Sequence, residues 1–178
     1  MKGSDFERYI AKTLSKWWTN NEREDIFWRT SQSGGRATTR KKVGKTTANQ
    51  DGDLCAIDPI GQPLINLTSI ELKKGYNGWT IKEMIDSRGT RNKTLLETFF
   101  AQASREAESQ GKSCWWLICR QDRREILVFI NSGFWKWIRR KIEPPKFTYI
   151  SIFHCEFGPV YAMKLDIFLT IVKPEFFV

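Results

Sequence analysis

The segment LTSIELKKGY, residues 67–76, constrains the fold more than any other, because apolar and charged residues alternate along it. Successive side chains of a β-strand point to opposite faces of the sheet. Ile70 and Leu72 would therefore share one face and pack in the core. Glu71 and Lys73 would share the other face. A strand with a purely structural role does not need a carboxylate and an ammonium group on the same face, so this face is a candidate functional surface.

Length and charge favour one globular domain that binds a polyanion. The chain has 178 residues, of which 40% are hydrophobic and 28% are charged, so it can bury the core of a single domain. Its 29 Lys and Arg residues exceed its 20 Asp and Glu residues, which gives a formal net charge of +9. Nucleic acid is the commonest polyanion that binds to such a surface.

Hydropathy and cysteine spacing argue against a membrane protein and against a zinc protein. No apolar run in the sequence approaches the ~18 residues of a membrane-spanning helix, and the N-terminal residues lack the apolar stretch of a signal peptide. The four cysteines form no CxxC pair, which favours reduced and mostly buried thiols over a zinc site. We therefore expect a cytoplasmic protein that does not contact a membrane.

Hydrophobic periodicity predicts an α/β fold. The predicted order is a helix, a strand, a β-hairpin, a second helix and two further strands, which corresponds to a mixed β-sheet flanked by helices. The predicted helices are 5–18 and 94–112, and the predicted strands are 25–31, 53–58, 64–74, 114–120 and 125–131. Residues 53–58 and 64–74 are the two strands of the hairpin, joined by the turn residues PIGQP.

No linker or change of composition divides the chain. We therefore expect a single domain over residues 1–178, with a core at about 4–130 and a C-terminal extension of the same domain at 131–178. Within this extension the sequence predicts only one strand, at 147–153, and a short apolar segment at the C-terminus.

A basic segment lies between the first strand and Asp53. Residues 32–52 contain almost no large apolar residue, and up to Gln50 they hold no acidic residue. The basic residues of this segment are Arg36, Arg40, Lys41, Lys42 and Lys45. Long loops inside compact domains are usually functional, and Lys and Arg contact phosphates without reading the base sequence. We therefore predict that this loop binds the nucleic-acid backbone; the alternative is a solvated, flexible segment.

Two other basic groups are weaker candidates for nucleic-acid binding. Lys74 follows Lys73 but points to the opposite face of the strand. Arg139, Arg140 and Lys141 lie close in sequence to Trp residues and could form a second contact surface. An amphipathic helix with a charged face explains these three residues equally well.

Two acidic residues are placed so that they can form a metal site. Asp53 begins the first strand of the expected hairpin, and Glu71 lies near the end of the second. Neighbouring residues of antiparallel strands are ~5 Å apart, so the two carboxylates could converge. Carboxylate, water and phosphate oxygens are the ligands that Mg²⁺ prefers, with Mn²⁺ as a substitute. Such an ion can polarise a phosphoryl group and supply hydroxide, while Lys73 could orient the attacking water or neutralise developing charge.

The order GDLCAID, hairpin turn, IELKKG resembles the Asp…Glu-x-Lys signature of the PD-(D/E)xK nuclease superfamily. The nearest branch contains archaeal Holliday-junction resolvases and related phage or restriction endonucleases, in which a Glu on the first helix corresponds to Glu7. The segment RTSQSGGR resembles the Ser-Gly loop of that branch. Gly52 is a departure, since the motif Asp is often preceded by Pro. Over about residues 4–130 the resemblance implies a restriction-endonuclease-like fold with an α-β-β-β-α-β-β core.

This resemblance implies that Glu7, Asp53, Glu71 and Lys73 are catalytic, with Asp53 and Glu71 holding the metal. Gln102, on the second helix, could support the site, as polar residues there do in relatives. Simpler alternatives remain open. Glu71 and Lys73 could form a weak ion pair on a solvated strand face. Asp51 could be the motif Asp in place of Asp53, or Asp53 could be a simple turn residue before a strand. Glu7 could complement the helix dipole.

Two other polar residues are expected to be structural. Asp58 precedes Pro59, as turn residues often do. His154 is the only histidine of the chain, and nothing in its sequence context suggests a catalytic role.

The function expected from these features is Mg²⁺-dependent hydrolysis of DNA phosphodiester bonds, with branched DNA such as a Holliday junction, or duplex DNA, as the substrate. A phage or prokaryotic origin would place the protein in a prokaryotic or virus-infected cell. A homodimer is one expectation, because nucleases that cut both strands are often symmetric dimers. The alternatives are a nucleic-acid-binding module without catalysis and a subunit of a larger nuclease.

Overall fold

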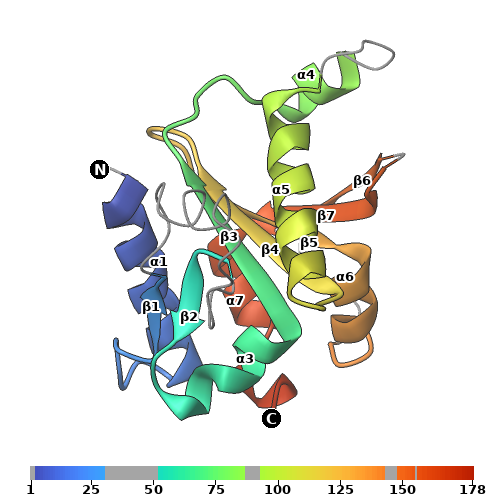
Figure 1. Cartoon of the computed structure of the whole chain (residues 1–178). Coiled ribbons are helices and arrows are strands. Elements are labelled where there is room, and N and C mark those ends of the chain that lie inside the picture. The colour runs from blue at the N-terminus through green and yellow to red at the C-terminus, as the bar shows by residue number, and fades with distance from the viewer. Residues whose placement is uncertain (1–2, 31–51, 87–92, 143–147, 155) are drawn as a thin grey trace, which may run out of the picture.

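A five-stranded mixed β-sheet forms the centre of the protein in the computed structural model, which describes residues 3–30, 52–86, 93–142, 148–154 and 156–178 (Figure 1). The strand order is β3-β4-β5-β7-β6. The strands are β3 (Thr68–Lys74), β4 (Cys114–Arg120), β5 (Ile126–Asn131), β6 (Ile150–His154) and β7 (Gly158–Lys164). Only β3 and β4 pair in parallel; the other neighbours within this sheet are antiparallel.

Helices cover both faces of this sheet. On one face lies α5 (Leu95–Ser109), whose buried residues pack against Leu117 and Phe129. On the other face α1 (Gly3–Trp18), α6 (Ser132–Ile138) and α7 (Leu165–Ile171) share a core with Trp116 and Ile118. Figure 1 shows α5 and α7 on opposite sides of the strands. Since β4 is buried on both faces, it forms a continuous apolar run rather than an alternating one.

The predicted fold class is therefore confirmed: helices flank a mixed sheet, in a form compatible with a restriction-endonuclease-like fold. The helix predicted at 94–112 corresponds to α5. A capping box between Thr94 and Glu97 begins this helix, and Gly111, with φ of +68°, follows its end. The crossover between the parallel strands β3 and β4 contains α5 and the short helix α4 (Ile81–Asp86).

The predicted hairpin between residues 53–58 and 64–74 is wrong. β2 (Leu54–Ala56) pairs with β1 (Phe27–Arg29) in a separate two-stranded sheet. Between β2 and β3 the chain forms a 3₁₀ turn, η1 (Pro59–Gly61), and then α3 (Gln62–Leu67). The Asp58 side chain accepts a hydrogen bond from the Ile60 amide at 3.0 Å and caps this turn. Capping followed by Pro at the first helical position starts a helix rather than a strand.

The C-terminal third is more regular than the sequence predicted. Besides the predicted strand, which is β6, it contains α6, β7, α7 and the final 3₁₀ turn η2 (Pro174–Phe176). This region packs against the first helix. The Trp17 indole donates a hydrogen bond to the Val172 carbonyl at 2.9 Å, and the Phe177 ring contacts those of Trp17 and Trp137.

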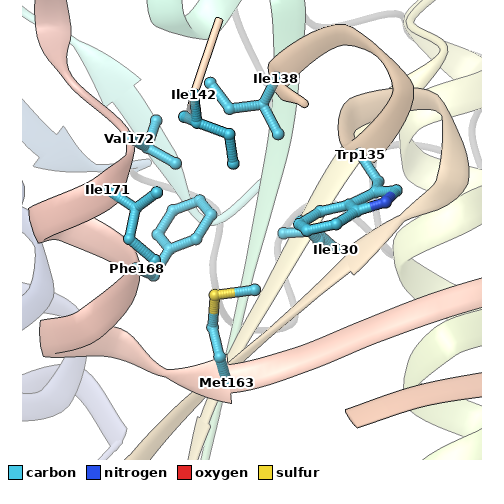
Figure 2. Close-up of a pocket in the computed structure, with 8 residues that line it drawn as sticks. All are labelled: Ile130, Trp135, Ile138, Ile142, Met163, Phe168, Ile171 and Val172. Atoms are coloured by element: carbon cyan, nitrogen blue, oxygen red, sulfur yellow. The ribbon is translucent and has the colours of Figure 1, made fainter. Parts of the chain in front are cut away.

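A small apolar pocket lies within this C-terminal region (Figure 2). Its walls come from β5, α6, β7, α7 and the residues that follow the helices. The lining residues are Ile130, Trp135, Ile138, Ile142, Met163, Phe168, Ile171 and Val172. A ligand site normally adds convergent polar groups to an apolar lining, and these side chains supply almost none. We interpret this pocket as a packing feature of the core.

Three cysteines fall within the described ranges: Cys55, Cys114 and Cys119. Cys114 and Cys119 are buried on β4, in agreement with the prediction of reduced, mostly buried thiols; Cys155 lies outside these ranges. None of the helices that the structure describes is long and apolar enough to cross a membrane.

Candidate active site

Asp53 reaches β3 through a backbone bridge rather than through a hairpin. Gly52 and Ile70 form an isolated parallel bridge, in which the Asp53 amide donates to the Ile70 carbonyl at 2.9 Å. On its other side, the Asp53 carbonyl accepts from the Thr30 amide at 2.9 Å. Asp53 is therefore fixed between the end of β1 and the edge of β3. Asp53 follows the bridged Gly52, and Glu71 follows its partner Ile70, so the two acidic residues are neighbours across the bridge. The structure brings these two residues together, although by a different backbone path from the one predicted.

Gly52 permits this close approach. Its φ is +72°, a left-handed conformation that proline cannot adopt and that other L-residues adopt only at a cost. A Cβ atom at this position would lie 2.4 Å from the Ile70 carbonyl oxygen, which belongs to the backbone of β3 and cannot move aside. The presence of Gly before Asp53, where the resemblance led us to expect Pro, thus has a structural reason in this protein.

Replacing Gly52 by Ala should displace Asp53 from β3. We expect a loss of about 10²-fold in any activity that depends on Asp53, because a shift of about 1 Å at a reacting centre has an effect of that size. Gly111→Ala is the matched control: Gly111 also has a positive φ, of +68°, but a Cβ atom added there would meet no described atom within 4 Å. Equal activity and equal urea stability of the two variants would contradict this explanation.

Glu71 is buried beneath α5, with only 1% of its surface exposed. Its Oε1 atom accepts hydrogen bonds from the Lys73 ammonium and from Gln102 Nε2, the latter at 2.8 Å. Its Oε2 atom is buried and has no hydrogen-bond partner among the residues that the structure describes. A buried carboxylate oxygen without a partner is costly, so the solvated strand face considered as an alternative is excluded.

Asp53 presents one free oxygen to the same region. Its Oδ2 atom accepts from the Leu72 amide at 2.8 Å, while Oδ1 receives no hydrogen bond from the described part of the chain. Burial raises the pKa of the Asp53 carboxyl from 3.8 to about 6, although the Leu72 amide and Lys73 oppose this shift. In Glu71, burial and the neighbouring Asp53 and Glu106 carboxylates raise the pKa from 4.5 to about 9.

Lys73 is the positive charge of this group. Burial disfavours its ammonium form, but attraction by Glu71 and Asp53 outweighs this effect and places the pKa of Lys73 above its ordinary value of 10.5. The side chain is 15% exposed and also lies over the Phe99 ring, 5.8 Å from its centroid. Lys73 is therefore a fixed cation at the surface end of the site and remains charged at neutral pH.

Two polar residues of α5 complete the group around Glu71. Gln102, which the sequence predicted as a supporting residue, lies at hydrogen-bond distance from Glu71 and also donates to Glu106 Oε1 at 2.9 Å. Glu106 was not predicted. The sequence feature that could have identified Glu106 was its spacing of four residues from Gln102. Residues four apart lie on the same face of a helix, and Gln102 was expected to lie near the site.

Glu7 lies near this group but is paired with a residue that the sequence did not identify. Its Oε2 atom is 3.3 Å from Arg29 Nη1, and the Glu7 side chain is only 14% exposed. Its charge contributes to the raised pKa of Asp53, so it is a near neighbour of that carboxylate. Arg29 comes from β1, which connects α1 to the edge where Asp53 lies. A signal for Arg29 would have been its place at the end of the strand that leads directly into the segment before Asp53.

Lys74 lies apart from these residues. Its ammonium group donates to Asp122 Oδ1 at 3.1 Å, its side chain is 7% exposed, and Asp122 also accepts from Asn77. This geometry ties the end of β3 to the turn between β4 and β5. Nucleic-acid binding by Lys74 stays a prediction.

Several predicted residues lie outside the described ranges. These are the loop residues Arg36, Arg40, Lys41, Lys42 and Lys45, and Asp51, the rival of Asp53. Of the second basic group, Arg139 and Arg140 are exposed after α6, and the Lys141 ammonium donates to the Phe176 carbonyl at 2.6 Å. DNA binding by these residues also stays a prediction.

His154 and Asp58 have structural contacts, as expected. His154 Nε2 lies 2.8 Å from Glu97 Oε1, and its Nδ1 accepts from the Glu156 amide at 3.1 Å. These bonds join the β6–β7 turn to the capped beginning of α5. Asp58 caps η1 and forms an ion pair with Arg23 at 2.7 Å.

The carboxylate oxygens of the site could bind a divalent cation, with water molecules and substrate phosphate oxygens as the remaining ligands. Among the described residues, no three His, Cys, Asp or Glu side chains are gathered closely enough to bind a metal ion alone. Asp53 Oδ1 and Glu71 Oε2 accept no hydrogen bond from the described part of the chain. Mg²⁺ typically uses one or two carboxylates, keeps several waters and accepts substrate phosphate oxygens. The donor set therefore fits Mg²⁺ or Mn²⁺.

Comparison with known proteins agrees with this chemistry. The model of the family described as "Phage putative PDDEXK endonuclease" matches residues 1–178. No curated protein and no solved structure gave a significant match.

Proposed function

Because the chain belongs to the phage family of PD-(D/E)xK endonucleases, we propose that it hydrolyses DNA phosphodiester bonds with the help of Mg²⁺ or Mn²⁺. The observation that carries this proposal is the buried Oε2 atom of Glu71, which has no hydrogen-bond partner among the described residues and lies beside a second carboxylate and a fixed cation. A divalent cation would satisfy that oxygen and offset the burial of both acids.

Asp53 and Glu71 are the residues that would hold the ion, through Oδ1 and Oε2. When bound, the ion supplies charge stabilisation at the phosphoryl group and lowers the pKa of water, so that hydroxide is available at neutral pH. The Leu72 amide fixes the Asp53 carboxylate by its hydrogen bond to Oδ2. Gln102 and Lys73 fix Glu71 by their bonds to Oε1. Both carboxylates are thus held in place before the substrate arrives, which reduces the reorganisation needed for catalysis.

Lys73 would act on the phosphate as a cation. Its raised pKa keeps it protonated at neutral pH, so it is unsuited to accept a proton from water. Its ammonium can donate a hydrogen bond to a non-bridging phosphate oxygen, or to the attacking water, while it stays bonded to Glu71. Negative charge accumulates on the phosphate oxygens in the transition state, and a fixed positive charge stabilises it.

DNA is the proposed nucleic acid, and branched DNA is the finer part of the proposal. The net charge of +9 favours a polyanion, and the basic loop residues from Arg36 to Lys45 are the proposed contacts to its backbone. Symmetric cleavage of a junction would require two active sites, which a homodimer supplies. Membership of a phage family supports an infected host cell as the setting of the proposed activity.

A cleavage panel tests the proposal. End-labelled four-way junction, flap, single-stranded and duplex DNA are incubated with the protein in Mg²⁺, Mn²⁺, Ca²⁺ or EDTA. We expect cleavage in Mg²⁺ and Mn²⁺, binding without turnover in Ca²⁺, and no cleavage in EDTA, because the larger Ca²⁺ ion would distort an oxygen site of Mg²⁺ size. Undiminished cleavage in EDTA would contradict metal dependence. Binding of DNA without cleavage under every condition would favour the non-catalytic alternative.

A further inference from the structure

Glu106 is a third carboxylate beside the proposed metal ligands, and its role is not explained by the family motif. It lies on α5, one turn after Gln102. One nitrogen atom, Gln102 Nε2, contacts both carboxylates: it lies 2.8 Å from Glu71 Oε1 and 2.9 Å from Glu106 Oε1. Glu106 is therefore held next to Glu71 by a shared hydrogen-bond donor.

The charges of this group do not balance within the described part of the chain. With all three acids ionised, as the binding of a cation requires, Asp53, Glu71 and Glu106 would contribute three negative charges, whereas Lys73 is the one described cation that is paired with them. Arg29 is paired instead with Glu7. A divalent cation would offset the two negative charges that remain after Lys73 is counted. A second observation also indicates a bound cation: Glu71 Oε2 is fully buried and has no hydrogen-bond partner among the described residues.

We propose that Glu106 belongs to the divalent-cation site and binds the ion through one of its coordinated water molecules. This inference rests on the proposed function, since it concerns the same ion. A water-mediated contact fits the geometry, because the described carboxylates do not form a ready-made group of three ligands, and Mg²⁺ gives up its waters reluctantly. Gln102 would set the distance between Glu106 and Glu71, which keeps the water position fixed.

A simpler interpretation would make Glu106 a surface residue that forms an i,i+4 hydrogen bond with Gln102. Such a bond is a weak interaction on a helix and needs no metal. In this interpretation a proton on Glu71, whose pKa is raised to about 9, forms a side-chain hydrogen bond to Glu106 and allows the two acids to lie side by side. The two interpretations differ in one measurable property, the affinity for a divalent ion in the absence of DNA.

The test is a titration of the full-length, DNA-free protein with Mn²⁺, followed by calorimetry and by the EPR signal of free Mn²⁺. Glu106→Gln should bind Mn²⁺ about 10- to 100-fold more weakly than the wild type, the effect typical of residues that support metal ligands. Glu108→Gln is the control, because it removes the same charge from an exposed position of α5, where Glu108 accepts a hydrogen bond from Ser104. Its affinity should stay within about twofold of the wild type, since isolated exposed charges contribute little.

The outcomes separate this inference from the proposed function. If the wild type binds Mn²⁺ and Glu106→Gln binds it equally well, Glu106 does not belong to the site. If Glu108→Gln weakens binding as much as Glu106→Gln, the effect is general electrostatics and the inference is again overturned. If the wild type does not bind Mn²⁺, the proposed metal-dependent function itself fails. Glu106→Ala provides the same comparison should the Gln variant fold poorly, as judged by circular dichroism.

Discussion

Glu71→Gln is expected to reduce DNA cleavage by about 10³-fold or more, because the loss of several kcal/mol of metal-based stabilisation corresponds to that factor at about 1.36 kcal/mol per tenfold. The amide keeps the volume of the side chain and its oxygen can still accept from Gln102, so the fold should persist. It removes the negative charge at the buried oxygen that has no partner among the described residues. Asp53→Asn should have a similar effect, since Oδ1 loses its charge while Oδ2 can still accept from the Leu72 amide.

The measurement is single-turnover cleavage at saturating DNA, which separates chemistry from binding. Glu125→Gln is a matched control, because the Glu125 side chain is 71% exposed and makes a long contact of 4.0 Å to Lys164. DNA affinity in Ca²⁺ should be similar for all these proteins. If either site variant retains more than a few per cent of the wild-type rate, that residue does not hold the catalytic ion, and Asp51 becomes the next position to test.

Local sequence patterns predicted the parts of the site that depend on one element. The alternation of apolar and charged residues along β3 correctly placed Glu71 and Lys73 on one face, because this property follows from strand geometry alone. The apolar stripe of residues 94–112 predicted α5 and its end at Gly111. The expectation that Gln102 lies near the site came instead from the resemblance to relatives that carry polar residues on this helix.

The prediction of a hairpin was wrong because a short apolar run does not distinguish a strand from a helix. Residues 64–67, Leu-Ile-Asn-Leu, suit either structure. The deciding feature was upstream, where Asp58 and Pro59 begin a helical segment. The error changed the path of the backbone but not the convergence of the carboxylates, because the bridge between Gly52 and Ile70 places Asp53 at the edge of β3.

Contacts between elements that are distant in the sequence could not be predicted from local sequence patterns. The pairing of Glu7 with Arg29 depends on how α1 lies against β1. The proximity of Glu106 to Glu71 depends on the rotation of α5, which the packing of Phe99 and Ala103 sets. In the C-terminal third, β7 inserts between β5 and β6, so the strand order differs from the order along the chain. No local pattern specifies such an insertion.

The stability of the metal-free protein should fall as pH rises from about 4.5 to about 9. In this range Glu71, whose pKa is raised from 4.5 to about 9, is protonated in the folded state and ionised in the unfolded state. The folded protein then binds more protons than the unfolded chain, so the free energy of unfolding decreases with pH. Asp53 adds a smaller effect of the same sign between 3.8 and about 6. The combined loss should be on the order of a few kcal/mol.

Divalent ions should oppose this loss, because they favour the ionised carboxylates that burial disfavours. The expected result is a urea midpoint in EDTA that is lower at about pH 8.5 than at about pH 5.5, and a gain on adding Mg²⁺ that is larger at the higher pH. Glu71→Gln should flatten both trends, while Glu125→Gln should leave them unchanged. Tryptophan fluorescence reports the unfolding, since Trp116 of β4 is fully buried in the folded protein. A midpoint in EDTA that rises over this pH range would contradict the raised pKa of Glu71 on which this prediction depends.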